Sequence, residues 1–517
     1  MPHRTTVGLT HQTLPGNTLA AVVGLRHTAR FRMKQYKNFI NGEWVAAASG
    51  DTFTNLNPAD TREAVAEYAK GGTADAQAAV EAAQAAFPGW RDTTPPARGK
   101  ILSAVANILA SRQGELAELL CREEGKTKIE AGMEVGRTVD IFRFMAGLSY
   151  TIGGQVVPHD LPNNMLYTKR EPLGVVALIT PWNFPIALPA WKLAPALVSG
   201  NTVVLKPASL APAMTMEIAK AFDEAGLPKG VLNVVVGSGK EVGDELATNA
   251  AVQAVSFTGS HSVGSGIYQQ LAPRMARAQM EMGGKNPTIV LADADLDHAA
   301  KLVAMAGYMM TGQVCTATSR AIVEESVADE FTEKLIAEAQ ARKVGNGLHE
   351  GVTMGPAVCA AELESTLDYL QIAKDEGAEV LWGGERLTEG DLEHGHFLSP
   401  AVIGNVKNDM RIAQEEVFGP AIGVVKAGDF DEALALANDI EFGLSASIIT
   451  RDINKAMRYT DRIEAGVVKI NQISTGLALQ VPFGGVKHSS TNSFKEQGQT
   501  AIDFYTRVKS VYLDYSA

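Results

Sequence analysis

The segment Gly312-Gln-Val-Cys315-Thr-Ala-Thr-Ser-Arg320 contains the strongest candidate nucleophile of the chain. Cys315 follows a glycine by three residues and precedes small polar residues, which predicts a turn that enters a helix. A helix N-terminus lowers the pKa of a thiol and offers backbone N–H groups to an oxyanion. We therefore predict a reactive thiol at Cys315; the alternative is the small buried hydrophobe that a free cysteine usually is.

A second segment, Glu281-Met-Gly283-Gly284-Lys-Asn-Pro287, places a carboxyl group beside two glycines. Glycines allow a backbone to approach a ligand closely. Apolar residues and glycines flank Glu281, so we expect a half-buried carboxyl group with a raised pKa, which suits a base that activates water. A solvated surface glutamate is the alternative interpretation.

Asn183 lies in the segment Pro181-Trp182-Asn183-Phe184-Pro185, directly after an apolar run at residues 175–180. The two prolines restrict the backbone, and the Asn183 amide could donate a hydrogen bond to an alkoxide. A structural turn in which the asparagine bonds locally is the alternative. The position at the carboxyl end of a strand, where α/β folds bind ligands, favours a functional role.

The segment Phe257-Thr258-Gly259-Ser260-His-Ser-Val-Gly264 is typical of a junction between a strand and a helix. Such a junction can present a helix N-terminus to a pyrophosphate. The segment lacks the G-x-G-x-x-G pattern of dinucleotide-binding proteins, and Gly237-Ser-Gly239 is only a fragment of that pattern. On spacing alone, dinucleotide binding is one of several open interpretations.

The elements that must position these residues alternate between apolar runs and amphipathic helices. This alternation indicates parallel sheets covered on both faces, in two α/β units that divide near Gly283-Gly284. The predicted strands lie at residues 175–180, 202–205, 231–236, 254–257, 288–291, 321–323, 401–403, 445–450 and 467–470, with a further strand at 508–514 that could pair outside its unit. The predicted helices lie at residues 74–87, with Thr73 as the N-cap, and at 212–225, 327–341 and 452–463.

Composition limits the classes of function. The chain has 517 residues and a mass of 54.9 kDa, which is enough for two or three domains. A net charge of −12 argues against sequence-independent binding to nucleic acid, and no apolar run approaches the roughly 18 residues of a membrane span. Cys121, Cys315 and Cys359 lie too far apart for a disulfide framework or a cysteine-based zinc site, so we expect a reducing, cytoplasmic location and no metal.

The first 32 residues are poor in acidic side chains. Their charged residues are Arg4, Arg26, Arg30 and Arg32, and the first acidic residue of the chain is Glu43. This composition is compatible with an organellar transit peptide. We prefer the interpretation that translation begins at Met33 and that residues 1–32 are a disordered or artefactual extension.

Taken together, these segments resemble the aldehyde dehydrogenase superfamily in their order and separation. The motifs are PWNFP, FTGS, EMGGKNP, GQVC, EEVFGP and PFGG, and the similarity covers the chain from about Lys37 to Tyr512. The resemblance implies an α/β fold that forms a homodimer or homotetramer. Its parts are a Rossmann-type cofactor-binding domain (residues 33–151 and 174–283), an α/β catalytic domain (284–483) and a small β oligomerisation extension (152–173 and 484–517).

The resemblance also implies roles for individual residues. Cys315 matches the nucleophile, Glu281 the general base, and Asn183 with the backbone N–H of Cys315 the oxyanion hole. Lys192 and Glu496 match a proton-relay pair behind the base. The positions expected to contact the cofactor are Lys206 (adenine ribose), Glu416 (nicotinamide ribose), Thr180, Pro181, Trp182, Ser209, Gly239, Phe257, Thr258, Gly259, Ser260, Met282 and Phe418.

The reaction implied by the resemblance is the NAD(P)-dependent oxidation of an aldehyde to a carboxylic acid through a thiohemiacetal and a thioester on Cys315. Family enzymes that are strict for NAD often carry a glutamate three residues after the lysine matched by Lys206, where it repels a 2′-phosphate. Ser209 occupies that position. We therefore expect NADP to be accepted as well as NAD.

The segment Pro482–Gly498 is similar to the α-ketoglutaric semialdehyde (2,5-dioxopentanoate) dehydrogenase branch, which acts in sugar-acid catabolism. An anionic substrate of that kind needs a cationic contact. Where succinic semialdehyde dehydrogenases place arginines, this chain has Trp191 and Met309. The candidate substitutes for those arginines are Arg137, Arg143 and Lys495.

Two other interpretations stay open from the sequence. An apolar set of side chains would suit an uncharged aliphatic or aromatic aldehyde instead: Phe144, Trp191, Met309 and Met310. A non-redox thiol esterase that uses Cys315 is the rival outside the family, although it leaves Lys206 and Glu416 without a role.

Overall fold

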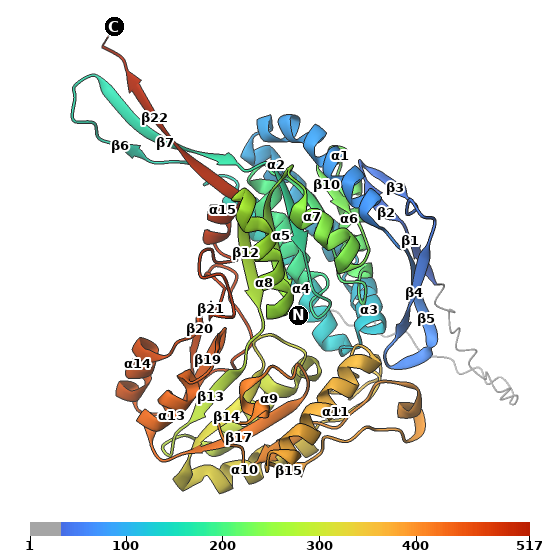
Figure 1. Ribbon diagram of the computed structural model, residues 1–517, viewed down its shortest axis with the longest axis vertical. Coiled ribbons are helices and arrows are strands. Elements are labelled where there is room, and N and C mark those ends of the chain that lie inside the picture. The colour runs from blue at the N-terminus through green and yellow to red at the C-terminus, as the bar shows by residue number, and fades with distance from the viewer. Residues whose placement is uncertain (1–32, 517) are drawn as a thin grey trace, which may run out of the picture. The chain divides into compact units, whose positions relative to one another are not determined.

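Two seven-stranded sheets dominate the structure, a computed structural model that describes residues 33–516 (Figure 1). Both sheets belong to the unit that begins at Lys34. Residues 1–32 lie outside the described part of the chain, so the expected extension stays a prediction. Every helix among residues 33–516 is too short or too polar to cross a lipid bilayer.

The first sheet has the strand order β12-β11-β8-β9-β10-β2-β3. Its first five strands are parallel, and the last two are antiparallel additions. The bounds are β2 (Asn38–Ile40), β3 (Glu43–Val45), β8 (Val175–Ile179), β9 (Thr202–Lys206), β10 (Leu232–Val234), β11 (Val252–Gly259) and β12 (Arg277–Met282). The four predicted strands of this sheet are confirmed, and β12, whose polar residues hide its burial, was not predicted.

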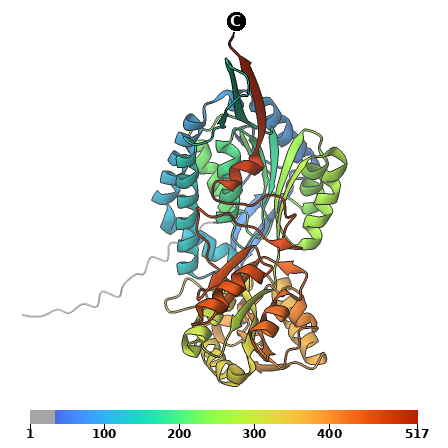
Figure 2. The ribbon, with the colours of Figure 1, turned by 90° about the vertical axis from the view of Figure 1, so that its left-hand side faces the viewer.

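Helices cover both faces of the first sheet, as its continuous apolar strands require. One face packs against α1 (Thr73–Asp92), α7 (Asp244–Thr248) and α8 (His261–Leu271). The other side carries α2 (Pro95–Ser111), α3 (Gln113–Glu124), α4 (Lys128–Leu148), α5 (Ala187–Val198) and α6 (Ala213–Glu224) (Figure 2). The predicted N-cap Thr73 is wrong by one residue: Gly72 is the cap, and its N–H donates to the Asp75 carboxylate at 2.9 Å.

The second sheet has the order β15-β16-β17-β14-β13-β19-β20 and is parallel except for β15. The bounds are β13 (Asn286–Val290), β14 (Thr318–Glu324), β15 (Glu379–Trp382), β16 (Ala401–Gly404), β17 (Ala421–Ala427), β19 (Ser445–Ile449) and β20 (Val467–Ile470). All five predicted strands of this sheet are confirmed, and β15 and β17 are additional. The chain passes from the first sheet to the second between Met282 and Asn286, where the sequence predicted a division.

Two apolar layers bury the faces of the second sheet. One contains α9 (Leu296–Tyr308) and α10 (Glu325–Gln340). The other contains α11 (Ala360–Asp375), α12 (Arg411–Gln414), α13 (Phe430–Asn438) and α14 (Ile453–Arg462). The predicted helices at 327–341 and 452–463 are confirmed.

Three strands project from the first sheet as an antiparallel extension (Figure 1). They are β6 (Val156–Val157), β7 (Asn164–Pro172) and β22 (Thr506–Asp514), and β22 pairs with β7 along its whole length. The predicted strand at 508–514 is thereby confirmed. The preceding residues contain β21 (Val486–Lys487) and α15 (Thr500–Tyr505) and run past Glu281 and α5, so only the last part of 484–517 joins the extension.

The remaining strands form two small sheets. β1 (Lys34–Tyr36), β5 (Asp60–Ala69) and β4 (Thr52–Asn57) make a three-stranded sheet in that order. β18 (Phe442–Gly443) pairs with β21.

Candidate active site

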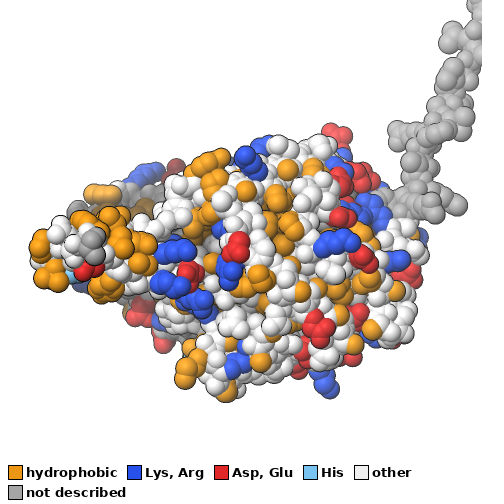
Figure 3. Space-filling model, turned by 90° about the horizontal axis from the view of Figure 1, so that it is seen from above, with side chains coloured by type: hydrophobic (Ala, Val, Ile, Leu, Met, Phe, Trp, Pro, Cys, Tyr) orange, Lys and Arg blue, Asp and Glu red, His pale blue; other side chains and the backbone are white. Residues whose placement is uncertain are grey.

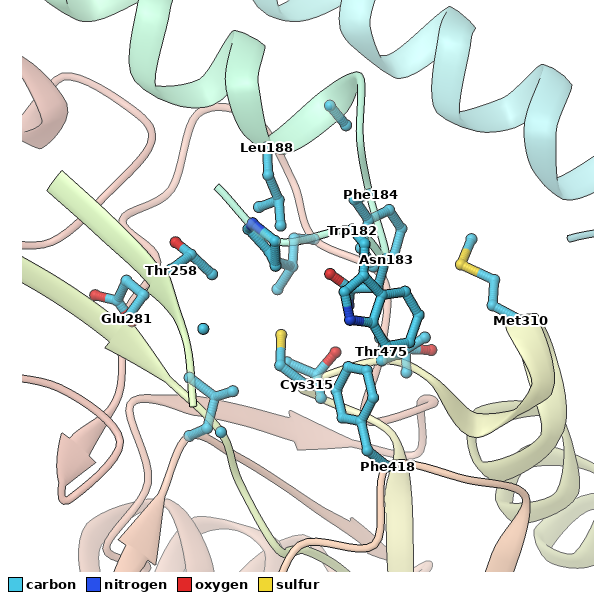
Figure 4. Close-up of a pocket in the computed structure, with 18 of the residues that line it drawn as sticks. Trp182, Asn183, Phe184, Leu188, Thr258, Glu281, Met310, Cys315, Phe418 and Thr475 are labelled. Carbon is cyan, nitrogen blue, oxygen red and sulfur yellow. The ribbon is translucent and has the colours of Figure 1, made fainter. Parts of the chain in front are cut away.

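A cavity of about 460 Å³ lies where the carboxyl ends of β8, β11 and β12 meet the second α/β unit. Carboxyl ends of parallel strands are the usual ligand sites of α/β folds. The side chains of Cys315, Asn183 and Glu281 come from three separate segments and line this one cavity. Figure 4 shows the Cys315 sulfur directed into it, between Glu281 on one side and Asn183 on the other.

Cys315 lies in a turn between a short 3-10 helix at Met309–Gly312 and strand β14. The prediction of a helix after Cys315 is therefore wrong, and no helix dipole lowers its pKa. Burial and the nearby Glu416 and Glu281 carboxylates instead raise the pKa of Cys315 to about 12. The thiol is consequently neutral near pH 7 unless a base or a positive charge acts on it.

Asn183 is buried and lies close to the Cys315 turn. Its side-chain Nδ2 donates to the Gln313 carbonyl oxygen at 2.9 Å, and its Oδ1 has no partner among the described residues. An amide nitrogen carries two hydrogens. One N–H of Asn183 is therefore fixed by the loop that carries the thiol, and the other is available to a ligand oxygen.

A buried ion pair supports the backbone of Asn183. The Lys126 ammonium donates to the Asn183 carbonyl oxygen at 2.8 Å and to Glu134 Oε2 at 2.6 Å. Glu134 Oε1 accepts the backbone N–H groups of Ile186 and Ala187, both at 3.1 Å, where α5 begins. Both side chains are almost fully buried. Glu124 Oε2 also lies 3.7 Å from the Lys126 ammonium. Removing Lys126 would leave the buried Glu134 without a cation, so the lysine fixes the turn that carries Asn183.

Glu130, one turn earlier on α4, holds the loop before Cys315. Its Oε1 accepts the N–H of Met310 at 2.7 Å, while its Oε2 accepts the N–H of Thr127 in the helix cap at 2.8 Å. Met310 and Thr311 have φ angles of 50° and 58°, a region that L-residues rarely adopt. Helix α4 thus anchors both the amide and the thiol segments.

Glu281 is buried near the end of β12. Its Oε2 accepts the N–H of Gly485 at 3.2 Å, and its Oε1 has no partner among the described residues. A Cβ atom at residue 484 would stand 2.4 Å from Oε1, so only Gly484 allows this approach. Burial and the neighbouring Glu496 raise the pKa of Glu281 well above its ordinary value, as the sequence predicted. One oxygen is held and the other is free, which suits a base acting on water.

Lys192 and Glu496 form a buried ion pair behind Glu281. The Lys192 ammonium also donates to Ser256 Oγ at 2.8 Å, and Ser256 donates to Gln279 Oε1 at 2.9 Å. The structure therefore brings this predicted pair together. Its Glu496 carboxylate lies close enough to Glu281 to influence the proton affinity of that group.

Lys206 is the last residue of β9, and Ser209 lies beside it just after the strand. The Lys206 ammonium donates to the Pro207 and Gly237 carbonyl oxygens at 3.0 and 3.2 Å, and Ser209 Oγ donates to Gly237 at 3.2 Å. Burial lowers the pKa of Lys206 to about 8, and Lys206 has no carboxylate partner among the described residues. A buried donor with only carbonyl partners fits the hydroxyl groups of a ribose.

The other predicted cofactor positions fall into two groups. Eight line the cavity: Pro181, Trp182, Thr258, Gly259, Ser260, Met282, Glu416 and Phe418. Gly239 begins a short π-helix next to Gly237, Thr180 is buried directly after β8, and Phe257 packs in the core beneath Gly259. Ser260 is the N-cap of α8 and lines the cavity, so a helix N-terminus lies at the cavity wall as predicted.

Glu416 reaches the backbone between the two sheets. Its Oε1 accepts the N–H of Gly284 at 3.1 Å, and a Cβ atom at residue 283 would stand 2.0 Å from its Oε2. The two glycines therefore permit this carboxylate to lie against the chain. The Thr258 hydroxyl is buried without a partner among the described residues. These polar groups between two glycine-rich turns fit a dinucleotide.

Comparison with known proteins gives this site a chemical context. The profile of the Aldehyde dehydrogenase family matches residues 44–511. An α-ketoglutarate semialdehyde dehydrogenase of Haloferax volcanii is 53% identical, over 93% of this chain and 99% of its own. An α-ketoglutaric semialdehyde dehydrogenase of Bacillus subtilis is 47% identical, over 92% of this chain and 98% of its own. The chain belongs to the aldehyde dehydrogenase family.

Solved structures agree with that membership. A betaine aldehyde dehydrogenase from Staphylococcus aureus, crystallised with NAD+, has a TM-score of 0.91 and 35% identity and covers 93% of this chain and 95% of its own. This chain is an NAD(P)-dependent aldehyde dehydrogenase with the α/β fold of its family. The non-redox thiol esterase considered from the sequence is not supported.

The lining of the aldehyde dehydrogenase cavity is mostly apolar. Met309, Met310 and Trp191 line it, whereas Phe144 of the predicted apolar set is not among the lining residues. Further lining side chains that the sequence did not single out are Met133, Phe184, Leu188, Val314, Glu362, Thr475, Leu477 and Phe483. Of the three candidate cations, Arg137 alone lines the cavity.

The most informative residues missed from the sequence lie on or just before α4. The stretch Glu123–Glu134 contains five charged residues besides Lys126, and such a run is usually a solvated face of a helix. In the structure, Lys126, Glu130 and Glu134 are buried. No sequence signal separates these charges from exposed ones, because their partners are backbone groups far along the chain.

Proposed function

We propose that this aldehyde dehydrogenase oxidises α-ketoglutaric semialdehyde (2,5-dioxopentanoate) to the dicarboxylic acid through a thioester on Cys315. The observation that carries the chemistry is the convergence of the Cys315 thiol, the Asn183 amide and the buried Glu281 carboxyl group on one cavity. The substrate is suggested by the two relatives named for this semialdehyde, at 53% and 47% identity.

In the proposed reaction the Cys315 thiol loses its proton to water in the cavity, and the resulting thiolate adds to the aldehyde carbon. The free N–H of Asn183 and the backbone N–H of Cys315 donate to the oxygen as it becomes negative. The oxidised nicotinamide, when bound, supplies the acceptor for the substrate hydride. Glu281 then takes a proton from water through its unpartnered Oε1, and the hydroxide hydrolyses the thioester. Lys192 and Glu496 carry the proton away from Glu281.

For the cofactor, we assign the adenine ribose to Lys206 and the nicotinamide ribose to Glu416. Gly259, the last residue of β11, and Ser260, the N-cap of α8, would lie against the pyrophosphate at a helix N-terminus. Ser209 stands beside Lys206 and is neutral, so it offers no charge against a 2′-phosphate. We propose that the enzyme uses NADP as well as NAD.

Steady-state kinetics with a substrate panel test the proposed function. The panel contains α-ketoglutaric semialdehyde, pentanal and benzaldehyde, each with NAD+ and NADP+, and the readout is reduced nicotinamide together with the acid product. We expect the highest kcat/KM for the semialdehyde acid. A higher kcat/KM for pentanal or benzaldehyde would favour the second candidate function, oxidation of uncharged aldehydes, which is suggested by the apolar wall of Trp191, Met309 and Met310.

We also propose a homodimer or homotetramer that assembles through the extension. Strand β22 lies at the edge of its sheet, and the extension exposes Val156, Leu161 and Tyr512 at 77%, 61% and 75%. Figure 3 shows apolar side chains gathered over its end. An exposed apolar edge strand favours pairing with another chain. Light scattering after gel filtration tests this: a monomer at micromolar concentration would contradict it.

The expected domain division follows the same proposal. We assign residues 33–151 and 174–283 to cofactor binding, 284–483 to catalysis, and β6, β7 and β22 to assembly. The three cysteines are free thiols, which supports the cytoplasm as the compartment.

A further inference from the structure

We propose that Arg137, oriented by Gln497, binds the carboxylate at the end of the substrate opposite the aldehyde. This inference rests on the proposed function, since it assumes that the substrate is a semialdehyde acid. It assigns substrate selectivity to a site on helix α4 that lies apart from the groups proposed to act on the aldehyde and on the cofactor.

Arg137 is the one lysine or arginine among the described residues that line the cavity. It lies one helical turn after Met133, which lines the cavity as well. The side chain is half-buried, and burial lowers the pKa of the guanidinium without removing its charge. Between residues 33 and 516, no carboxylate comes within ion-pair distance of Arg137. Asp140 on the same helix acts on Arg137 only from beyond that distance. The partly desolvated guanidinium therefore favours an anionic ligand.

Gln497 holds the guanidinium in place. The Arg137 Nη2 atom donates to Gln497 Oε1 at 3.1 Å. Gln497 is 3% exposed and has a φ angle of 61°, so the fold keeps this side chain buried in a backbone conformation that glutamine rarely adopts. Its Nε2 has no partner among the described residues. A buried, unpartnered amide N–H beside a guanidinium provides a second donor next to the first.

The backbone before Gln497 fixes that amide at the cavity wall. Phe483 lines the cavity, and its N–H donates to the Glu496 carbonyl oxygen at 2.7 Å, with the reverse bond at 2.6 Å. Glu496 is also the proposed proton-relay partner of Lys192. The chain segment that positions the relay carboxylate therefore positions the orienting amide in the next residue.

The other charges of the cavity wall are compatible with an anionic substrate. Four carboxyl groups line it. Glu134 is paired with Lys126, and burial raises the pKa of Glu281, Glu362 and Glu416. Raised pKa values lower the negative charge that an incoming carboxylate meets.

The two alternative cations do not face the cavity. Arg143 is exposed on α4, and the Lys495 ammonium donates to the Gly484 and Gly485 carbonyl oxygens. Arg143 therefore offers a matched control on the same helix.

The ratio of kcat/KM for α-ketoglutaric semialdehyde to kcat/KM for pentanal reports selectivity, because both aldehydes have five carbons and only one carries a carboxylate.

We expect Arg137→Met to lower this selectivity ratio roughly 10- to 100-fold, as the loss of one charge-assisted contact predicts, chiefly through a higher KM for the semialdehyde. Arg137→Lys should recover part of the ratio, since lysine keeps the charge but not the fork of donors. Gln497→Glu should lower the ratio too, because its carboxylate would occupy Arg137. Arg143→Met should keep the wild-type ratio.

The outcomes separate the two proposals. A wild-type enzyme without preference for the semialdehyde over pentanal would overturn the proposed substrate and this inference together. A wild-type preference that survives in Arg137→Met would overturn the inference and leave the proposed function standing. An equal fall of kcat/KM for both aldehydes in Arg137→Met would show a structural role and overturn the inference as well.

Discussion

The cavity has two ends with different chemical character. At the catalytic end, buried polar groups surround the Cys315 sulfur, and burial raises the pKa of Cys315, Glu281 and Glu416. At the far end, where we place the carboxylate of the substrate, the lining residues include apolar side chains such as Trp191 and one guanidinium, that of Arg137. At the catalytic end, hydrogen bonds to the backbone and ion pairs hold the polar side chains in place. Changes there should slow every aldehyde, whereas changes at the far end should alter which aldehyde is oxidised.

Replacement of the proposed oxyanion donor should give the largest effect at the catalytic end. We expect Asn183→Ala to lower kcat by about 10²- to 10³-fold, as the loss of one such donor usually does. The fall should be similar for α-ketoglutaric semialdehyde and pentanal. Asn454→Ala, on the exposed start of α14, is the control. Near-normal turnover by Asn183→Ala would contradict the assignment.

Loss of the buried ion pair behind Asn183 should lower kcat for every aldehyde, but less than loss of the Asn183 amide does. Lys126→Met leaves Glu134 unpaired and frees the Asn183 carbonyl, so kcat should fall roughly 10- to 100-fold for both aldehydes and thermal stability should fall too. The exposed Lys128→Met is the matched control. A loss of stability with unchanged kcat in the folded enzyme would show that Lys126 does not position the amide.

The pH dependence of thioester hydrolysis tests the proposed base. The pKa of Glu281 is raised, so its basic form is lost at a higher pH than for an ordinary glutamate. Hydrolysis of preformed acyl-enzyme should therefore slow as pH falls through this pKa, by about tenfold per pH unit below it. A flat profile across neutral pH would contradict a raised pKa for the catalytic base.

Substitution of Ser209 should have the smallest effect. It should change only the preference for NADP or NAD. Ser209→Glu places a negative charge beside the site proposed for the adenine ribose. We expect kcat/KM for NADP to fall about tenfold relative to that for NAD, because the carboxylate repels a 2′-phosphate. Ser209→Gln is the neutral control of similar size. An unchanged ratio of the two cofactors would place the 2′-phosphate elsewhere.

The two ends of the cavity also differ in how well the sequence predicts them. Cys315, Glu281 and Asn183 stand in short segments with glycines or prolines, so their types and neighbours mark them without a structure. The parallel strands were visible as apolar runs, whereas β12 was not, because Arg277, Gln279 and Glu281 interrupt its pattern. The thiol pKa was predicted in the wrong direction, since no helix follows the Cys315 turn.

The far end could be predicted only in part. Arg137 was one of three candidate cations, and nothing in the sequence separated it from Arg143, six residues later on the same helix. Which of the two faces the cavity depends on how α4 packs. The role of Gln497 depends on a contact across 360 residues of the chain, and the burial of Lys126 on partners in other elements. Such long-range contacts leave no local pattern.

Trapping of the covalent intermediate tests the central claim most directly. Glu281→Gln should retain the addition and oxidation steps and lose hydrolysis. After rapid mixing with α-ketoglutaric semialdehyde and oxidised cofactor, one equivalent of reduced nicotinamide should form in a burst, and mass spectrometry should find the acyl group on Cys315. Steady turnover at the wild-type rate, or a burst with no adduct on the Cys315 peptide, would contradict the account.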